Sequence, residues 1–358
     1  MPAPLLFDAH LDLAINALEW NRDLTQPIDV LRERERHLTD KPDRAHNTVS
    51  LPEIRKAGIG ICVATQLARI ELDAYSPVQG WRSPAQAWAM TQGQLAWYRA
   101  MEELGEMIQI RDLAGLRTHL ENWDTDPEHT PIGYILSLEG ADSLVTLDHL
   151  ERSYEDGLRA IGPAHYGPGV YANGTDATGG FNQRGKDLLR EIARLGLILD
   201  VTHLCDDCFW EALDLFDGPL WASHQNCRTL VPHNRQFSDE QIRAVIERGG
   251  VFGAPMDAWM IVPDWQRGKT TPQSAGVTLQ HSTDHIDHIC QLAGNAHHIG
   301  VGSDLDGCFG TEQTPQDVQT IADLQKLPAI LKDRGYSESD LTNFRSGNFL
   351  RFLETAWA

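Results

Sequence analysis

The chain has 358 residues, 41% of them hydrophobic, so it is long and apolar enough to bury a large core. Its formal net charge of −21, from 51 acidic and 30 basic residues, argues against nucleic acid or an anionic membrane surface as a partner. Six thinly spread cysteines, an N-terminus without a secretory signal pattern, and no run of roughly 18 apolar residues lead us to expect a cytoplasmic protein.

Strand-like apolar runs alternate along the chain with stretches of helical periodicity. The eight runs cover residues 4–11, 58–67, 133–140, 158–165, 197–203, 219–224, 250–256 and 298–305. The clearest helical patterns cover residues 183–196, 206–216, 238–250 and 278–295. This alternation predicts an α/β fold, a (β/α)₈ TIM-type barrel that forms a single domain over residues 1–358, with a doubly wound open sheet as the alternative.

Two segments fall outside the alternation. Residues 68–132, with a helix near 84–107, are predicted to form an insertion between the second and third strands. Residues 337–357 are predicted to form a C-terminal helix that closes the barrel. Within the regular part, Ser238 and Gln241 have the spacing of a capping box, which marks a helix start.

The first predicted strand contains a histidine and an aspartate two residues apart, in "FDAHLDLA". Side chains at positions i and i+2 of a strand point to the same face, so His10 and Asp12 converge on one point. A metal ion needs such convergence. For this pair alone, the alternative to a metal site is a structural histidine at the strand end that forms a hydrogen bond to its neighbour.

Six of the eight predicted strands end on a residue that can bind a metal or transfer a proton. These residues are His10, Asp12, Glu139, His165, His203, His224 and Asp304. Because the C-terminal ends of all strands meet at one face of a parallel barrel, we expect these side chains to be neighbours. Crowding them without a cation would be costly, and imidazoles with carboxylates favour zinc or a similar metal over an iron–sulfur or structural cysteine site. Their number implies two metal ions that share a carboxylate.

Two other motifs are interpreted as structural. "HSTDHIDHI" places His281, His285 and His288 on one helix face, but in mid-helix and far from a strand end. "CDDC" places Cys205 and Cys208 in the first turn of a predicted helix, and the chain has no second such pair. We therefore expect packing or solvated side chains at both motifs.

The chain also carries longer motifs around these polar positions and near its C-terminus: "DAHLDL", "SLEGADSL", "DVTHLCDDCFWEAL", "WASHQNCRTLVPHNRQFSDEQI", "GVGSDLDG" and "GNFLRFLE". In order and spacing they resemble the membrane (renal) dipeptidase family of the amidohydrolase superfamily, from residue 7 to about residue 355. The resemblance implies a binuclear zinc barrel that hydrolyses small dipeptides, including those with a C-terminal D-residue, by a metal-bridging hydroxide. It also implies two Zn²⁺ per chain and a small-molecule substrate as the partner. Whether the protein forms a homodimer stays open.

The resemblance further assigns the metal ligands. His10 and Asp12 would hold one zinc ion, and His203 and His224 would hold the other. Glu139 would bridge the two ions.

The remaining site residues receive catalytic and binding roles from the same resemblance. His165 would polarise the scissile carbonyl and stabilise the oxyanion, and Asp304 would pass a proton from water to the leaving amine. Arg235, in "PHNRQF", would bind the terminal carboxylate of the substrate. A surface arginine paired with Asp239 or Glu240 is the alternative for this residue.

Two positions depart from the family pattern. Asp142 stands where members commonly have a histidine, and Met256 lies in the seventh-strand region where they often have other residues with a nearby tyrosine. These changes spare the metal ligands and alter the pocket wall. They leave open a different amide substrate, such as an N-acyl amino acid, and a barrel that binds metal without catalysis.

Overall fold

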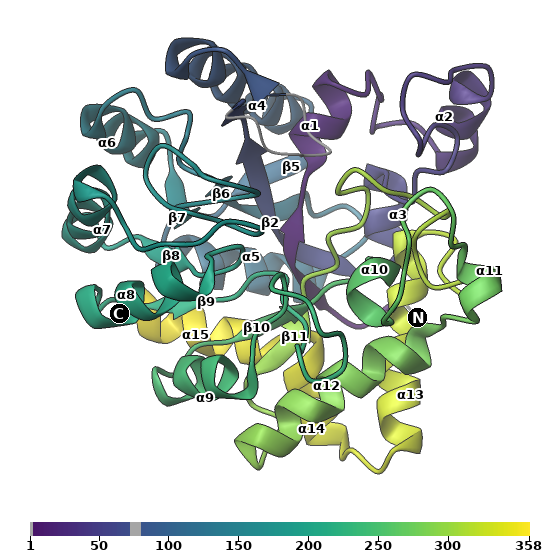
Figure 1. Cartoon of the computed structure of the whole chain (residues 1–358). Helices are drawn as coiled ribbons and strands as arrows, with labels where there is room; N and C mark the ends of the chain where they lie inside the picture. The colour runs from purple at the N-terminus through teal and green to yellow at the C-terminus, as the bar shows by residue number, and fades with distance from the viewer. Residues whose placement is uncertain (1–2, 72–79) are drawn as a thin grey trace.

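Parallel strands form the centre of the molecule and helices surround them (Figure 1). The computed structural model describes residues 3–71 and 80–358. In these residues one sheet contains β1 (Leu6–Leu11), β2 (Ile59–Leu67), β5 (Met107–Gln109), β6 (Ile132–Glu139), β7 (Leu158–Gly162), β8 (Ile198–Asp200), β9 (Leu220–Trp221), β10 (Phe252–Ala254) and β11 (Ile299–Val301).

The sheet closes on itself as a barrel. Its strand order is β10-β11-β1-β2-β6-β7-β8-β9, and every pair is parallel. A single bridge between Ala222 and Phe252 joins the two ends of this order, with hydrogen bonds of 2.9 Å from Ala222 N to Val251 O and from Gly253 N to Ala222 O. The predicted (β/α)₈ barrel is confirmed, and the open-sheet alternative is wrong.

The helices cover the outside of the barrel between the strands, as predicted from the alternating sequence pattern. Their bounds are α1 (Leu13–Leu18), α2 (Ile28–Glu35), α3 (Leu51–Lys56), α4 (Pro84–Glu103), α5 (Leu113–Thr125), α6 (Leu147–Glu155), α7 (Gln183–Arg194), α8 (Asp206–Leu215), α9 (Asp239–Glu247), α10 (Ala258–Ile261), α11 (Pro272–Ala275), α12 (Leu279–Ala293), α13 (Leu327–Asp333), α14 (Glu338–Thr342) and α15 (Asn348–Ala356). The predicted capping box is present at the start of α9, where Ser238 and Gln241 exchange hydrogen bonds. Among the described helices, none has the length and apolar character needed to span a bilayer.

The strands are buried on both faces, which explains their continuous apolar sequences. All residues of β2 and β6 are buried. Alternate strand residues, among them Phe7 and Ile135, share a buried cluster with Phe349 of α15. The rings of Phe7 and Phe349 stack with centroids 4.8 Å apart. The C-terminal helix thus packs near the beginnings of the strands, where it closes the barrel.

This closing segment is less regular than the sequence predicted. Instead of one helix over residues 337–357, α14 is followed by a π-helical stretch, Asn343–Gly347, and then by α15. The Asn348 N–H donates to the carbonyl of Asn343, five residues earlier. The wider turn interrupts the α-helical hydrogen-bond pattern.

The later strands are shorter than predicted. His165, His203, His224 and Asp304 each lie three residues beyond the last residue of their strand. At two of these positions the backbone has left the extended conformation altogether, with φ of 69° at His203 and 55° at Asp304. The prediction that strands end on the polar residues is therefore wrong for these four, which lie on loops at the C-terminal ends of the strands.

The predicted insertion between the second and third barrel strands is present. It contains β3 (Arg69–Ile70), β4 (Gly80–Trp81), α4, β5 and α5, while residues 72–79 lie outside the described residues. The sequence analysis missed β5, which pairs in parallel with the start of β6. Its three residues are too few to give a period-2 signal.

Near the ends of β10 and β11 two backbone segments approach each other closely, so a larger residue at this place should strongly destabilise the folded protein. A Cβ atom at Gly302 would lie 1.8 Å from the carbonyl oxygen of Ser223 and 2.7 Å from the Cα of Gly253. Since both neighbours are backbone atoms that cannot rotate away, Gly302→Ala is expected to lower the free energy of unfolding by about 3 kcal/mol or more.

Gly93 in α4 supplies the matched control. A Cβ atom there would meet only the Cδ1 atom of Leu18, at 3.8 Å. Gly93→Ala is expected to stabilise the protein by about 0.5–1 kcal/mol, because alanine restricts the unfolded chain more than glycine does. Urea unfolding of the metal-free protein measures the free energy of unfolding of both variants. Equal values for Gly302→Ala and Gly93→Ala would show that the backbone at Gly302 can move to accept a side chain.

Candidate active site

Five side chains from four strand ends converge at the C-terminal face of the barrel. They form two groups that share Glu139: His10 and Asp12 complete the first, and His203 and His224 complete the second. Within each group, one ligand atom from every residue lies within 4.8 Å of the others. The predicted convergence is confirmed.

His10 presents a ring nitrogen to several carboxylates without a hydrogen bond. Its Nε2 atom lies 3.6 Å from Glu139 Oε2, 3.8 Å from Asp12 Oδ2 and 3.9 Å from Asp304 Oδ1. These distances are too long for hydrogen bonds, and among the described residues this buried nitrogen has no hydrogen-bond partner. Asp12 accepts a short hydrogen bond from the Thr65 hydroxyl. A cation between these atoms would satisfy the nitrogen and the carboxylates together.

His203 and His224 face each other across the second group. Their Nε2 atoms are 3.1 Å apart and lie 3.3 and 3.4 Å from Glu139 Oε1. The opposite ring nitrogens are held by hydroxyls, since Nδ1 of His203 is 2.9 Å from Thr175 Oγ1 and Nδ1 of His224 is 2.9 Å from Ser223 Oγ. If each Nδ1–H is donated to its hydroxyl, both Nε2 atoms keep a lone pair that can bind a metal ion.

Burial dominates the protonation of these groups. It lowers the pKa of His203 and of His224 well below that of an ordinary histidine, and it raises the pKa of Glu139 and of Asp304 above that of an ordinary carboxyl. Burial also opposes the charge on His10, but the neighbouring carboxylates outweigh it and raise the His10 pKa. The neutral imidazoles of His203 and His224, next to the Glu139 carboxyl, which is costly to ionise, form a donor set that fits a divalent metal ion.

His165 lies beside this donor set. Its Nε2 atom is 4.0 Å from Glu139 Oε1, and its buried Nδ1 atom has no hydrogen-bond partner in the part of the chain that the structure describes. Burial, together with the positive charges of Arg69 and Arg235, lowers the His165 pKa to about 3. The ring is therefore neutral near pH 7 and can offer an N–H donor to a developing negative charge.

Arg235 is buried and only 2% exposed. Its Nη1 donates to Gln225 Oε1 and its Nη2 donates to the carbonyl of His224, both at 2.9 Å. These two contacts fix the guanidinium at the wall of the small cavity next to the donor set. The alternative of a surface ion pair with Asp239 or Glu240 is wrong.

The wall of this cavity also contains residues that the sequence analysis missed. They are Tyr166, Asp257, Met260, Arg267 and Cys308. The guanidinium of Arg267 contacts the Tyr166 hydroxyl at 3.4 Å and Asp257 Oδ2 at 3.7 Å. Tyr166 could have been found as the neighbour of His165 in the sequence, whereas the irregular segment after β10 carries no motif that marks Asp257 or Arg267.

The two departures from the family pattern have structural roles. Asp142 accepts hydrogen bonds from the backbone N–H groups of Ile70 in β3 (3.1 Å) and of Val170 in the loop after β7 (2.8 Å), so it joins these two segments. Met256 is fully buried in the core and does not line the cavity, so the expectation that it forms the pocket wall is wrong. Met260, four residues later, occupies the wall instead.

The two motifs interpreted as structural contact the protein interior. The ring of His285 is buried, with Nε2 3.0 Å from the carbonyl oxygen of Ile261. Cys205 and Cys208 are buried free thiols that both approach the carbonyl of Gly179 at 3.3 Å. These contacts confirm the packing interpretation for His285 and for both thiols.

A parallel barrel with imidazoles and carboxylates gathered at the C-terminal ends of its strands is the architecture of a metal-dependent hydrolase. Comparison with known proteins narrows this class. The model of the membrane dipeptidase family, peptidase family M19, matches residues 2–357. The chain belongs to this family.

Curated relatives are moderately similar in sequence. An uncharacterized protein in the pqqA 5′ region of Klebsiella pneumoniae is 31% identical over 216 residues, covering 58% of this chain and 76% of that protein. Dipeptidase tcpJ of Claviceps purpurea is 28% identical over 232 residues, covering 62% of this chain and 51% of its own length. The match thus spans about half the length of the fungal relative.

Solved structures share the whole fold. A dipeptidase AC of family M19 has a TM-score of 0.81 at 23% identity, with 100% of this chain and 99% of that chain covered. A metallopeptidase from Rhodobacter sphaeroides, liganded with a phosphinate mimic of L-Ala-D-Ala, has a TM-score of 0.80 at 22% identity, with both chains fully covered.

Proposed function

We propose that this protein is a binuclear, zinc-dependent dipeptidase that hydrolyses small dipeptides with a free C-terminal carboxylate. The observation that carries the proposal is the pair of donor groups that share Glu139, with a buried arginine at the wall of the same cavity. The family assignment and the dipeptide mimic bound by the Rhodobacter sphaeroides protein support the same substrate class, including a D-residue at the C-terminal position.

In this proposal His10 and Asp12 would hold one zinc ion, His203 and His224 would hold the other, and Glu139 would provide a ligand to each site. Nitrogen and carboxylate donors, with no thiolate among them, favour zinc over softer metals. When bound, the ions supply Lewis acidity that lowers the pKa of water and polarises a carbonyl group.

His165 and Asp304 carry the proton and charge chemistry. The neutral His165 ring donates an N–H to the carbonyl oxygen of the substrate as negative charge develops on it, so it stabilises the tetrahedral oxyanion. Asp304 accepts a proton from the attacking water and delivers it to the leaving amine. Its carboxylate lines the same cavity as His165, 3.9 Å from the His10 ring.

Arg235 binds the C-terminal carboxylate of the dipeptide. We expect the zinc-loaded protein to hydrolyse unblocked L-L and L-D dipeptides much faster than their C-terminal amides. Arg235→Met is expected to raise KM for unblocked dipeptides by about 10- to 100-fold, because a charge-assisted hydrogen bond contributes about 1.5–3 kcal/mol. The amides should be affected far less, so the variant loses the discrimination between the two substrate sets.

Steady-state kinetics on both substrate sets, with N-acyl amino acids as a third set, test the proposed function. Faster turnover of N-acyl amino acids than of every free dipeptide would move the substrate class to other amides. Zinc binding without hydrolysis of any of the three sets would indicate a barrel that binds metal without catalysis. An unchanged ratio of dipeptide to amide turnover in Arg235→Met would remove Arg235 from carboxylate binding.

We further propose that residues 1–358 act as one catalytic domain and that the protein works in the cytoplasm. The proposed location is supported by the six cysteines, all of which are free thiols and thinly spread over a long chain.

A further inference from the structure

The loop after β11, which carries Asp304, has an unfavourable backbone conformation. Three residues in it that are not glycine have positive φ: 55° at Asp304, 62° at Asp306 and 67° at Cys308. A positive φ is unfavourable for a residue with a side chain, and a loop with three such residues keeps its shape only where surrounding contacts enforce it.

Part of this support comes from the segment before α3, which donates hydrogen bonds to the carboxylate of Asp306. It accepts hydrogen bonds from the Thr48 N–H at 2.6 Å, the Thr48 hydroxyl at 2.7 Å and the Val49 N–H at 3.0 Å. Asp306 is 1% exposed, so these bonds are shielded from water. They tie the loop to the N-terminal part of the chain.

Asn16 connects this loop directly to the end of β1. Its Nδ2 atom donates to the carbonyl of Asp306 at 2.8 Å and to the carbonyl of Asp12 at 3.0 Å. The side chain is buried in α1, and both of its amide hydrogens are used. One amide group therefore joins the backbone of a proposed metal ligand to the loop that carries Asp304.

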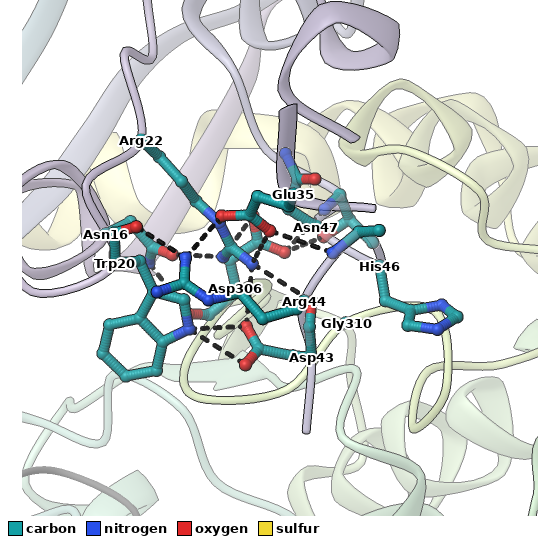
Figure 2. A network of polar contacts seen from close by, with 12 residues as sticks. Asn16, Trp20, Arg22, Glu35, Asp43, Arg44, His46, Asn47, Asp306 and Gly310 are labelled. Atoms are coloured by element: carbon teal, nitrogen blue, oxygen red, sulfur yellow. Dashed lines mark hydrogen bonds and ion pairs between the residues drawn. The ribbon is translucent and has the colours of Figure 1, made fainter. Parts of the chain in front are cut away.

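Arg22 fixes the orientation of that amide. Its Nη1 donates to Asn16 Oδ1 at 2.6 Å, which directs the Nδ2 atom of Asn16 toward the two carbonyls. Arg22 is itself held by the carboxylates of Glu35, at 2.9 and 3.1 Å, and of Asp43, at 3.0 Å. Figure 2 shows this buried network, in which Arg44 also contacts Glu35.

We infer that Asn16, oriented by Arg22, is a positioning residue that fixes the separation between Asp12 and Asp304. The inference rests on the proposed roles of these two aspartates. It assigns catalytic importance to a side chain that touches neither metal nor substrate. Loss of its two N–H donors should loosen both the metal ligand and the proton carrier, whereas loss of a merely structural contact would lower stability alone.

The chain contains a matched control in Asn348, at the start of α15. Its Nδ2 atom donates to the carbonyls of Ala296 at 2.8 Å and Ile299 at 2.7 Å, and its Oδ1 atom accepts from Arg351 at 2.6 Å. Asn348 is 1% exposed, as buried as Asn16 at 2%. The two asparagines thus make the same set of contacts at opposite ends of the barrel strands.

The experiment compares Asn16→Asp with Asn348→Asp in the full chain. Each change keeps the size of the side chain and its arginine contact but removes two N–H donors. We expect both variants to have a lower Tm. Asn16→Asp alone should lower kcat for an unblocked dipeptide and weaken zinc binding, measured by chelator competition, each by about 10- to 100-fold.

Asn16→Ala and Asn348→Ala form a second pair in case the added carboxylate prevents folding. Equal losses of Tm with wild-type kcat and wild-type zinc affinity in the Asn16 variants would overturn the inference. If the wild-type protein hydrolyses no dipeptide, the proposed function fails, but zinc affinity still tests Asn16: weakening only in the Asn16 variants supports the inference, and equal affinity in all variants overturns it.

Discussion

Asp304→Asn is expected to lower kcat for dipeptide hydrolysis by about 10²- to 10⁴-fold, with a much smaller change in KM. Asparagine has the shape of aspartate but can neither accept nor release the proton that hydrolysis must move from water to the leaving amine. In the metal-free fold burial raises the pKa of the Asp304 carboxyl above that of an ordinary carboxyl. That property suits a group that must take up a proton and give it back.

The Asp304→Asn measurement needs two controls. Zinc content by elemental analysis and Tm should both stay close to those of the wild-type protein, because the proposed ligands are unchanged. A variant with normal zinc content and a kcat within about threefold of wild type would exclude Asp304 as the proton carrier. A variant that loses zinc would instead show that Asp304 belongs to the ligand set, which its place beside His10 and His224 allows.

The convergence of the site residues could be predicted because it follows from topology. In a parallel barrel every strand delivers its C-terminal end to the same face, so a polar residue after each apolar run predicts a shared location. His10, Glu139 and His224 are far apart in the chain, yet they meet as expected. The prediction needed only the strand count, and errors of three residues in the strand ends did not affect it.

The wall of the cavity could not be predicted in the same way. Asp257 and Arg267 lie in a long irregular segment after β10, where neither the period of a helix nor that of a strand constrains the fold. From this region Met256 was predicted to alter the cavity wall, but Met256 is buried in the core, and Asp257 and Met260 line the cavity. Loop conformation depends on contacts between distant segments, which local patterns do not record.

The buried network around Arg22 was missed for a related reason. Charged residues such as Arg22, Glu35 and Asp43 normally indicate an exposed segment, and the sequence shows no sign that they are buried together. Their burial is stabilised by mutual ion pairs and by the ion pair of Arg22 with Asp306, which lies far away in the chain. Only the folded structure reveals such a network.

Glu139→Gln is expected to change stability in opposite directions with and without zinc. Burial raises the Glu139 pKa, so the ionised carboxylate is disfavoured in the metal-free fold. A neutral amide of the same shape removes that cost, and in the presence of a chelator we expect the variant to unfold at the wild-type temperature or above it. In saturating zinc the order should reverse, because a ligand that binds the folded state at 100 times its Kd adds about 2.7 kcal/mol of stability.

The same substitution tests whether one carboxylate serves both metal sites. Glu139 Oε1 lies 3.3 Å from His203 Nε2 and its Oε2 lies 3.6 Å from His10 Nε2, so each donor group loses an anionic ligand at once. We therefore expect zinc content to fall from two ions to one or none per chain, and kcat/KM to fall by about 10³-fold or more. Thermal unfolding with and without zinc, together with elemental analysis, measures these effects. Two tightly bound ions in Glu139→Gln would show that Glu139 does not bridge the metals.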